Sequence, residues 1–150
     1  MNVIILGCGR VGSTLARSMY KDGHNVTMID LLSESFRRLG SKFKGQRVVG
    51  NGVDEDVLKR AGIENCDLFV AVTQGDNRNI MAAQIAHNVY QVPKVLTRIN
   101  DPVRADAYRE RGIATICGTT IMAGLIREFA NTDRWAIEKD YNKEYLALNA

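Results

Sequence analysis

Three glycines near the amino terminus have the spacing of a phosphate-binding loop. The segment GCGRVG, residues 7–12, reads G-x-G-x-x-G and lies between an apolar run and an amphipathic segment. At this spacing Gly7 permits a tight turn, Gly9 lets the backbone come close to a pyrophosphate, and Gly12 lets a helix pack against a strand. The free N–H groups and positive dipole end of that helix then point toward the phosphates. The loop therefore predicts that the chain binds a nucleotide.

Two charged residues extend this prediction. Asp30 ends a second apolar run eighteen residues after Gly12, where a carboxylate can accept hydrogen bonds from both hydroxyls of an adenosine ribose. The same carboxylate repels a 2′-phosphate, which disfavours NADP. Arg10 places a fixed cation inside the loop, where it can reach a phosphate and favours a ligand with additional phosphate charge. The alternatives are that Asp30 only caps a strand end and that Arg10 is only exposed.

Polar residues also follow three later strand candidates. Asn51 and Gly52 come after the third, and an amide that can both donate and accept suits the edge of adenine. Thr73 follows the fourth and Arg98 closes the fifth. Because the carboxyl ends of parallel strands meet at one edge, where ligands bind in such folds, these residues are expected to line one crevice. Each could instead be only a turn or cap residue.

Apolar runs that alternate with helical patterns predict the scaffold for these residues. They favour an α/β fold, a Rossmann-like, doubly wound sheet of six parallel strands with helices on both faces. The strands are expected at residues 3–6, 26–29, 47–49, 68–72, 95–99 and 114–116. Helices are expected from the glycine loop to Gly23, from a cap at Ser33, from a cap at Asp54, over 77–90, from Pro102 to before Gly112, and over 120–129.

The bulk composition is that of one globular domain. A chain of 150 residues can bury one sizeable core, so residues 1–130 are interpreted as one nucleotide-binding domain and 131–150 as a C-terminal tail or linker. Basic residues are interspersed with acidic ones at a net charge of +3, which disfavours a nucleic-acid partner. The basic cluster around Arg37 and Arg38 is interpreted as a solvated helix face.

Other features bear on location and on metals. There is no apolar run of the roughly 18 residues that span a bilayer and no basic leader, so a cytoplasmic protein without direct membrane insertion is expected. Three widely spaced cysteines, Cys8, Cys66 and Cys117, are typical of reduced thiols rather than of a disulfide framework or a metal site. We therefore expect no metal.

The sequence contains no recognisable catalytic motif. Six strands and their helices take up residues 1 to about 130, and no Ser-His-Asp set, Tyr-x-x-x-Lys or G-x-x-x-x-G-K motif is present. This favours a protein that is not an enzyme and whose nucleotide is read out through conformation or assembly. Two alternatives stay open: the cofactor-binding domain of an NAD-dependent oxidoreductase, and an adaptor in which the nucleotide is only structural.

A series of motifs adds a resemblance to a known family. In chain order they are GCGRVG, Asp30, GNGVDEDVLKRAGI, CDLFVAVTQGDNRNIMAAQIA, VLTRINDP and YRERGIATICGTTIMAG. In order and spacing they resemble the N-terminal domain of the TrkA/KtrA family, also called RCK or KTN domains. The resemblance implies a cytosolic regulator of a membrane potassium channel or transporter, held at the inner face of the membrane by that partner. It also implies binding of NAD(H), ATP, ADP or AMP, a homodimer and a larger ring, such as an octamer.

The resemblance also assigns roles position by position. The implied phosphate-binding residues are Gly7, Gly9, Arg10, Val11 and Gly12; Asp30 would hold the ribose, Asn51 and Gly52 would border adenine, and Thr73 and Arg98 would line the crevice. The helix at 121–129 would be the crossover element that packs on a partner subunit. These residues cannot rank NAD(H) against ATP, ADP or AMP, because all of them carry the ribose that Asp30 would recognise.

Three features depart from the family pattern. Many relatives read G-D-A where this chain has Gly50-Asn51-Gly52, which leaves the base preference open. Relatives that bridge phosphates through a divalent ion use an acidic residue after the sixth strand, whereas residues 117–120 here read CGTT. The family's C-terminal ligand-binding domain does not occur within these 150 residues.

Overall fold

Six parallel strands form a single sheet in the computed structural model, which describes residues 1–132. The strand order is β3-β2-β1-β4-β5-β6. The strands are β1 (Asn2–Leu6), β2 (Asn25–Asp30), β3 (Gln46–Val49), β4 (Leu68–Ala71), β5 (Lys94–Arg98) and β6 (Ala114–Ile116). The chain first builds outward from β1 to β3 and then returns to place β4 on the other side of β1. This confirms the predicted doubly wound, Rossmann-like sheet.

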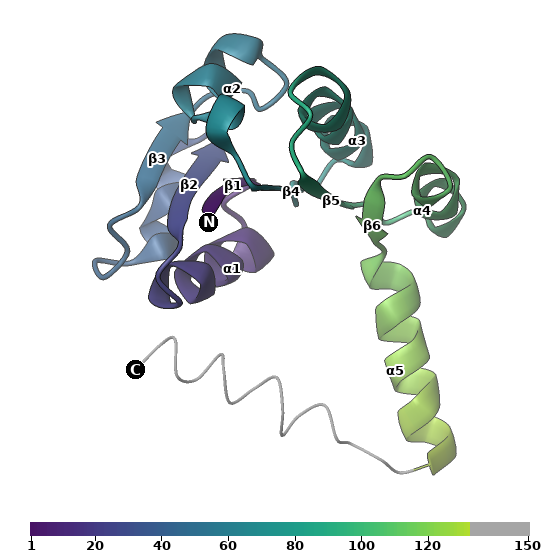
Figure 1. Cartoon of the computed structure of the whole chain (residues 1–150). Helices are drawn as coiled ribbons and strands as arrows, with labels where there is room; N and C mark the ends of the chain where they lie inside the picture. The colour runs from purple at the N-terminus through teal and green to yellow at the C-terminus, as the bar shows by residue number, and fades with distance from the viewer. Residues whose placement is uncertain (133–150) are drawn as a thin grey trace.

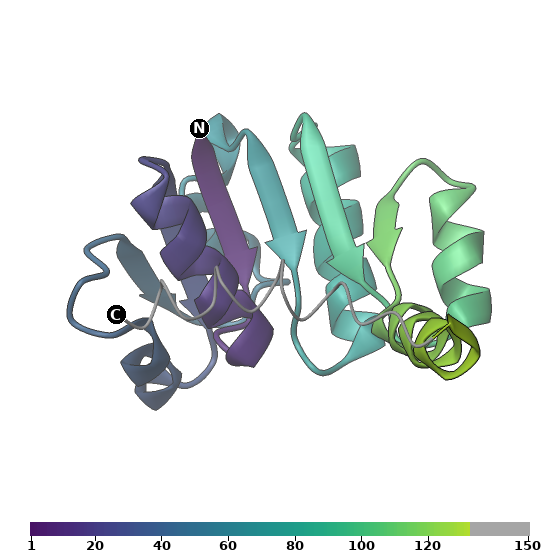
Figure 2. The same cartoon turned by 90° about the horizontal axis from the view of Figure 1, so that it is seen from below.

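Helices cover both faces of this sheet (Figures 1 and 2). They are α1 (Arg10–Lys21), the 3-10 helix η1 (Ser33–Leu39), α2 (Glu55–Arg60), the 3-10 turn η2 (Ile63–Asn65), α3 (Asp76–Gln84), the π-helical turn η3 (Ile85–Val89), α4 (Pro102–Arg109) and α5 (Gly118–Thr132). One face carries α1 and η1, whereas α2 and α3 lie on the other.

Alternate residues of the central strands supply the two cores. Val3 and Ile5 of β1 pack with α1 and η1, and Ile4 and Leu6 pack with α2 and α3. All four are nearly inaccessible to solvent. Because successive side chains of a strand point to opposite faces, a strand covered on both faces reads as a continuous apolar run. Residues 3–6 and 68–72, predicted as strands from their apolar runs, are such covered strands.

The register brings the carboxyl ends of the central strands to one level. Leu6 of β1 pairs with Ile29 of β2 on one side and with Ala71 of β4 on the other. The loops that leave β1 and β4 run to opposite faces of the sheet, so a crevice opens between them. In open α/β sheets this reversal of strand order is where ligands bind.

Several predicted helix ends are confirmed. Asp54 caps α2 by accepting a hydrogen bond from the Asp56 N–H at 2.9 Å, and Pro102 lies in the first turn of α4. Gly23 follows α1 with φ of +85°, a left-handed conformation that glycine adopts without strain.

Two predicted helices differ from the structure. The cap at Ser33 is wrong: η1 is a 3-10 helix preceded by Leu32, and the Leu32 N–H is instead bound by the Asp30 carboxylate at 2.9 Å. The helix predicted over 77–90 begins at Asp76 and widens into the π-helical turn η3. There the Tyr90 N–H reaches back to the Ile85 carbonyl, five residues earlier. After η3, Gln91 has φ of +51°, which turns the chain out of the helix before β5 begins.

The last described element, α5, extends away from the sheet (Figure 1). None of its residues is buried in the chain. It is longer at both ends than the predicted helix, and it includes residues 131 and 132 of the predicted tail. The rest of that tail, residues 133–150, lies outside the described residues. Within residues 1–132, no helix has both the length and the apolar character needed to cross a membrane.

Candidate functional site

A cavity of about 750 Å³ opens at the carboxyl ends of β1, β2, β4 and β5. The glycine loop, the start of α1, the segment after β2 with η1, and the loop after β4 form its walls. Eight predicted site residues line it: Gly7, Gly9, Arg10, Val11, Asp30, Gly52, Thr73 and Arg98. Gly12 and Asn51 are not in the lining. The crevice predicted from the strand ends is therefore present, and most of the residues assigned to it meet there.

Each loop glycine meets a different steric demand. Gly7 has φ of +106°, and a Cβ there would come within 2.9 Å of the Thr73 backbone nitrogen. At Gly12 a Cβ would collide with the carbonyl oxygen of Gly7, because the first turn of α1 packs directly on the turn after β1. At Gly9 no atom lies within 4 Å of an added Cβ, so the backbone there is open to the cavity. These are the turn, packing and approach that the spacing predicts.

Asp30 organises the loop that it faces. Its Oδ2 accepts a hydrogen bond from the Cys8 N–H at 2.7 Å, and its Oδ1 accepts one from the Leu32 N–H at 2.9 Å. An ionised carboxylate can accept about four hydrogen bonds. Two backbone bonds therefore leave capacity for the ribose hydroxyls that the sequence predicts as its ligand.

Four arginines face this single carboxylate. Arg10, Arg38, Arg78 and Arg98 line the cavity, whereas Asp30 is the one acidic residue among the lining residues of the described chain. The Arg98 guanidinium is fixed because its Nη2 donates to the Thr73 carbonyl at 2.6 Å. An excess of planar, permanently charged donors suits a ligand with several phosphate oxygens.

Arg38 has a place that the sequence interpretation did not include. It lies on an exposed face of η1, as expected, but it also lines the cavity. The reason is local, because η1 folds back over the glycine loop and the Cys8 thiol donates to the Ser35 carbonyl at 3.3 Å. Sequence reasoning also missed Arg78, although its place in the first helical turn after β4 was a usable signal.

Asn79 is a second residue that the sequence reasoning missed. Its side chain is fully buried at the start of α3. Its Oδ1 accepts from the N–H and the hydroxyl of Thr73, at 2.9 and 2.6 Å, and its Nδ2 donates to the carbonyls of Thr73 and Arg98, at 3.0 and 2.9 Å. It therefore holds the loop after β4 against the end of β5. The available signal was a polar residue among apolar neighbours such as Ile80, Ala82 and Ala83.

Asn51 lies in a turn outside the cavity lining. Its Oδ1 accepts from the Val53 N–H at 3.4 Å, and its carbonyl accepts from the Asp54 N–H at 3.0 Å. Gly52 does line the cavity, and a Cβ there would press on the Leu6 side chain. A role for Asn51 at adenine stays a prediction.

Family comparison gives the chain its assignment. Residues 3–119 match the TrkA-N domain family. The chain belongs to the TrkA-N family. Its match spans β1 to the start of α5 and so includes every wall of the cavity.

Curated relatives of this TrkA-N domain are potassium uptake proteins by name. The "Trk system potassium uptake protein TrkA" of Streptomyces coelicolor is 51% identical over 116 residues, which are 77% of this chain and 52% of that protein. The "Trk system potassium uptake protein TrkA homolog" of Methanothermobacter thermautotrophicus is 35% identical over 113 residues, 75% of this chain and 52% of that protein. The chain thus spans about half the length of these two relatives.

Solved structures share the fold of this TrkA-N domain at low identity. The AMP-bound C-terminal domain of Kef from Shewanella denitrificans is 19% identical, with a TM-score of 0.75 over 99% of this chain and 89% of that one. The RCK domain of GsuK is 17% identical, with a TM-score of 0.75 over 93% of this chain and 30% of that one. At such identities the likeness shows the fold.

Cys8 lies inside the glycine loop of the TrkA-N domain but is not a thiolate. Burial, followed by the negative charge of Asp30, raises its pKa from 9.0 to about 11. Its side chain is fully buried and donates to the Ser35 carbonyl. A thiol that stays protonated at neutral pH is a poor nucleophile, so the loop cysteine is a packing residue.

Gly12 and Gly9 of the glycine loop allow a matched pair of substitutions. Gly12→Ala should lower the free energy of unfolding by about 1–3 kcal/mol, because the new methyl group overpacks the contact with Gly7. Gly9→Ala should cost less than about 1 kcal/mol, since it adds a methyl group in open space at the helix cap. Urea unfolding of both variants measures the difference, and equal losses would contradict the packing role of Gly12.

The Cys8 thiol predicts a dependence of stability on alkaline pH. Between pH 9 and about 11 an unfolded Cys8 loses its proton whereas the folded one retains it. The unfolded state then binds fewer protons, so stability falls as the pH rises, by up to about 1.4 kcal/mol per pH unit for one group. Urea unfolding from pH 8 to 11 should show a shallower decline for Cys8→Ala than for the unchanged chain. If stability declined equally steeply with pH in both proteins, the raised pKa of Cys8 would be refuted.

Proposed function

We propose that this chain is the nucleotide-sensing regulatory domain of a potassium uptake system. The observation that carries the proposal is the arginine-lined cavity between β1 and β4 in a chain of the TrkA-N family. We infer potassium uptake as the regulated process because the curated relatives described above are named Trk system potassium uptake proteins. A cytoplasmic domain bound to a membrane channel or transporter is the arrangement that we infer.

The proposed ligand is an adenine nucleotide, NAD(H) or ATP, ADP or AMP. Its phosphates would lie over the open backbone at Gly9 and the first turn of α1, with Arg10, Arg38 and Arg78 within the same cavity. Asp30 would accept hydrogen bonds from the ribose. Solved structures of this fold include Kef with AMP bound and GsuK with ADP or NAD bound, which supports this class of ligand.

A regulatory role accounts for the site better than the oxidoreductase alternative. The loop cysteine is protonated, and neither His24 nor His87 is among the lining residues. Hydride transfer to a substrate also needs an acid or base beside the nicotinamide ring, and the one carboxylate among the described lining residues, Asp30, already binds two backbone N–H groups. We therefore propose that nucleotide binding itself is the signal.

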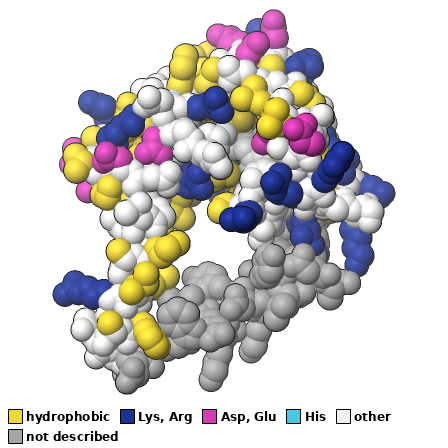
Figure 3. All heavy atoms as spheres, turned by 180° about the vertical axis from the view of Figure 1, so that it is seen from behind, with side chains coloured by type: hydrophobic (Ala, Val, Ile, Leu, Met, Phe, Trp, Pro, Cys, Tyr) yellow, Lys and Arg dark blue, Asp and Glu magenta, His cyan; other side chains and the backbone are white. Residues whose placement is uncertain are grey.

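We also propose that α5 pairs with α5 of a second copy. Ile121, Met122 and Ile126 are 47%, 64% and 59% exposed, and hydrophobic side chains gather along this helix (Figure 3). A face that is the same on both subunits can bury itself in a twofold contact. Such a dimer would be the unit of the ring that the family resemblance implies.

Nucleotide binding can be tested by thermal unfolding. NAD, NADH, ATP, ADP and AMP are titrated separately, and a ligand at 100 times its Kd should stabilise the chain by about 2.7 kcal/mol. Arg38→Ala should weaken the binding by about 1 kcal/mol, or roughly fivefold in Kd, because it removes a cation from the cavity. Arg37→Ala is the matched control, because Arg37 is adjacent to Arg38 in the sequence but is not among the residues that line the cavity. If none of the five ligands binds at millimolar concentration, the proposal fails.

Assembly through α5 has its own test. Ile126→Asp should convert the dimer to a monomer, because it buries an unpaired charge in the contact, while the monomer keeps its stability since this side chain is exposed. Arg127→Asp places aspartate on the polar side of the same helix and should leave the dimer intact. Sedimentation equilibrium distinguishes them, and a dimer that survives Ile126→Asp would exclude this face.

A further inference from the structure

One wall of the cavity is bonded to the loop that precedes α4. Thr73, Gln74 and Arg78 line the cavity, and Asp76, in the same stretch, begins α3. The Asp76 carboxylate accepts hydrogen bonds from the Asn100 N–H, at 3.0 Å to each oxygen, and from the Asp101 N–H at 3.1 Å. The loop after β5 is therefore hydrogen-bonded to the stretch of chain that forms this cavity wall.

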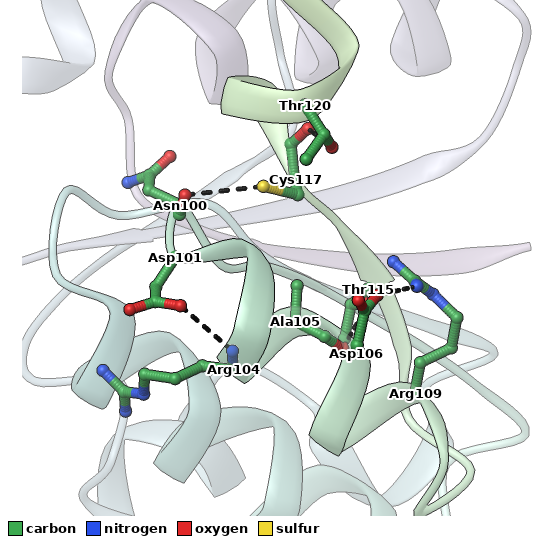
Figure 4. A network of polar contacts seen from close by, with 9 residues as sticks. All are labelled: Asn100, Asp101, Arg104, Ala105, Asp106, Arg109, Thr115, Cys117 and Thr120. Carbon is green, nitrogen blue, oxygen red and sulfur yellow. Dashed lines mark hydrogen bonds and ion pairs between the residues drawn. The ribbon is translucent and has the colours of Figure 1, made fainter.

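The same loop receives the start of α5. The Asn100 carbonyl accepts hydrogen bonds from the Thr119 hydroxyl at 2.8 Å and from the Cys117 thiol at 3.4 Å, the second of which Figure 4 shows. Cys117 is 4% exposed and packs with Ile99 and Ala105. Its carbonyl accepts from the Ile121 N–H, the first hydrogen bond of α5.

The bond from the Asp101 N–H to Asp76 and both bonds to the Asn100 carbonyl act on one rigid unit, whereas the Asn100 N–H belongs to the preceding peptide. The Asn100 carbonyl and the Asp101 N–H belong to the same peptide group, which is planar and trans. In a trans peptide these two groups point in opposite directions. One side of the peptide is therefore bound to Asp76 beside the cavity, and the other side is bound to the first turn of α5.

The first turn of α5 is the part of the helix that these bonds anchor to the sheet. None of the residues of α5 is buried, so the anchored first turn contributes to the direction in which the helix leaves the sheet. Asn79 reinforces the anchor, because it bonds both Thr73 at the cavity and the carbonyl of Arg98 two residues before Asn100.

We propose that the Asn100–Asp101 peptide couples the cavity wall to the direction of α5. A ligand that engages Gln74 or Arg78 displaces the stretch 73–78, Asp76 moves with it, and the peptide transmits the displacement to Thr119. This inference rests on the proposed function, since it takes a nucleotide as the ligand. It makes Thr119 a positioning residue that lies outside the cavity.

Thr119→Val tests the coupling, because valine keeps the shape of threonine but cannot donate to Asn100. Thr120→Val is the matched control, since the Thr120 hydroxyl donates to Cys117 within its own turn. Amide hydrogen exchange over residues 118–132 is measured by mass spectrometry with and without saturating ADP and, separately, NAD, and Kd is measured for each variant.

The unchanged chain and Thr120→Val should show the same nucleotide-dependent change in exchange over α5. In Thr119→Val that change should fall at least about twofold, while Kd stays within about threefold because the residue does not touch the ligand. Asp76→Ala, which breaks the opposite side of the peptide link, should give the same loss of response.

Three results would overturn the coupling. They are nucleotide binding without any change in α5 of the unchanged chain, a full response in both Thr119→Val and Asp76→Ala, and an equal loss of response in Thr120→Val. Absence of nucleotide binding to the unchanged chain is a different failure, because it overturns the proposed function and this inference with it.

Discussion

The contact between Gly12 and the carbonyl oxygen of Gly7 is the constraint on which the rest of the site depends. It allows α1 to begin immediately after the turn that ends β1, with no side chain between helix and strand. The helix axis, and with it the free N–H groups of the first turn, is thereby directed at the crevice where the strand order reverses. The open backbone at Gly9 and the tight turn at Gly7 matter only because this packing has already set the position of α1. A larger residue at 12 would move the helix and with it one wall of the cavity.

The charged residues that line the cavity are one carboxylate and four arginines. Asp30 already binds two backbone N–H groups, which fixes both the glycine loop and the entry to η1. Arg10, Arg38 and Arg78 are exposed, and Arg98 is held by Thr73. A ligand with both a neutral diol and phosphates matches this set of charges, because the diol can donate to Asp30 and the phosphates can accept from the arginines. The sequence predicts Asp30, Arg10 and Arg98 for this site, and the structure adds Arg38 and Arg78 to the cavity lining.

The parts of the site that were predictable are those determined locally. The glycine loop, Asp30 and the strand ends follow from spacing and apolar runs, because each depends on a few adjacent residues and on the parallel sheet. Arg38 was not predictable in this way, since its place depends on η1 folding over the loop as a 3-10 helix. Asn79 was missed because its tie to the Arg98 carbonyl joins residues 19 apart in the sequence, and the bonds from Asn100 and Asp101 to Asp76 likewise join residues 24 and 25 apart. Asn51 follows the expected strand, but its Oδ1 and carbonyl oxygen accept hydrogen bonds within the turn after β3 and it is not among the lining residues, so its role at adenine stays a prediction.

The polar links around Asn100 explain why α5 can project from the sheet and yet remain connected to the cavity. A helix anchored by a broad apolar face would be held by many contacts, and no single loop could turn it. Here no residue of α5 is buried, and its first turn is connected to the sheet through the end of β6, a buried thiol and the hydrogen bonds around the Asn100–Asp101 peptide. Such a junction can transmit a small displacement of its base over the length of the helix. In the proposed dimer, the exposed apolar face of α5 would contact the partner, while the bonds at its first turn would make the helix responsive to the state of the cavity.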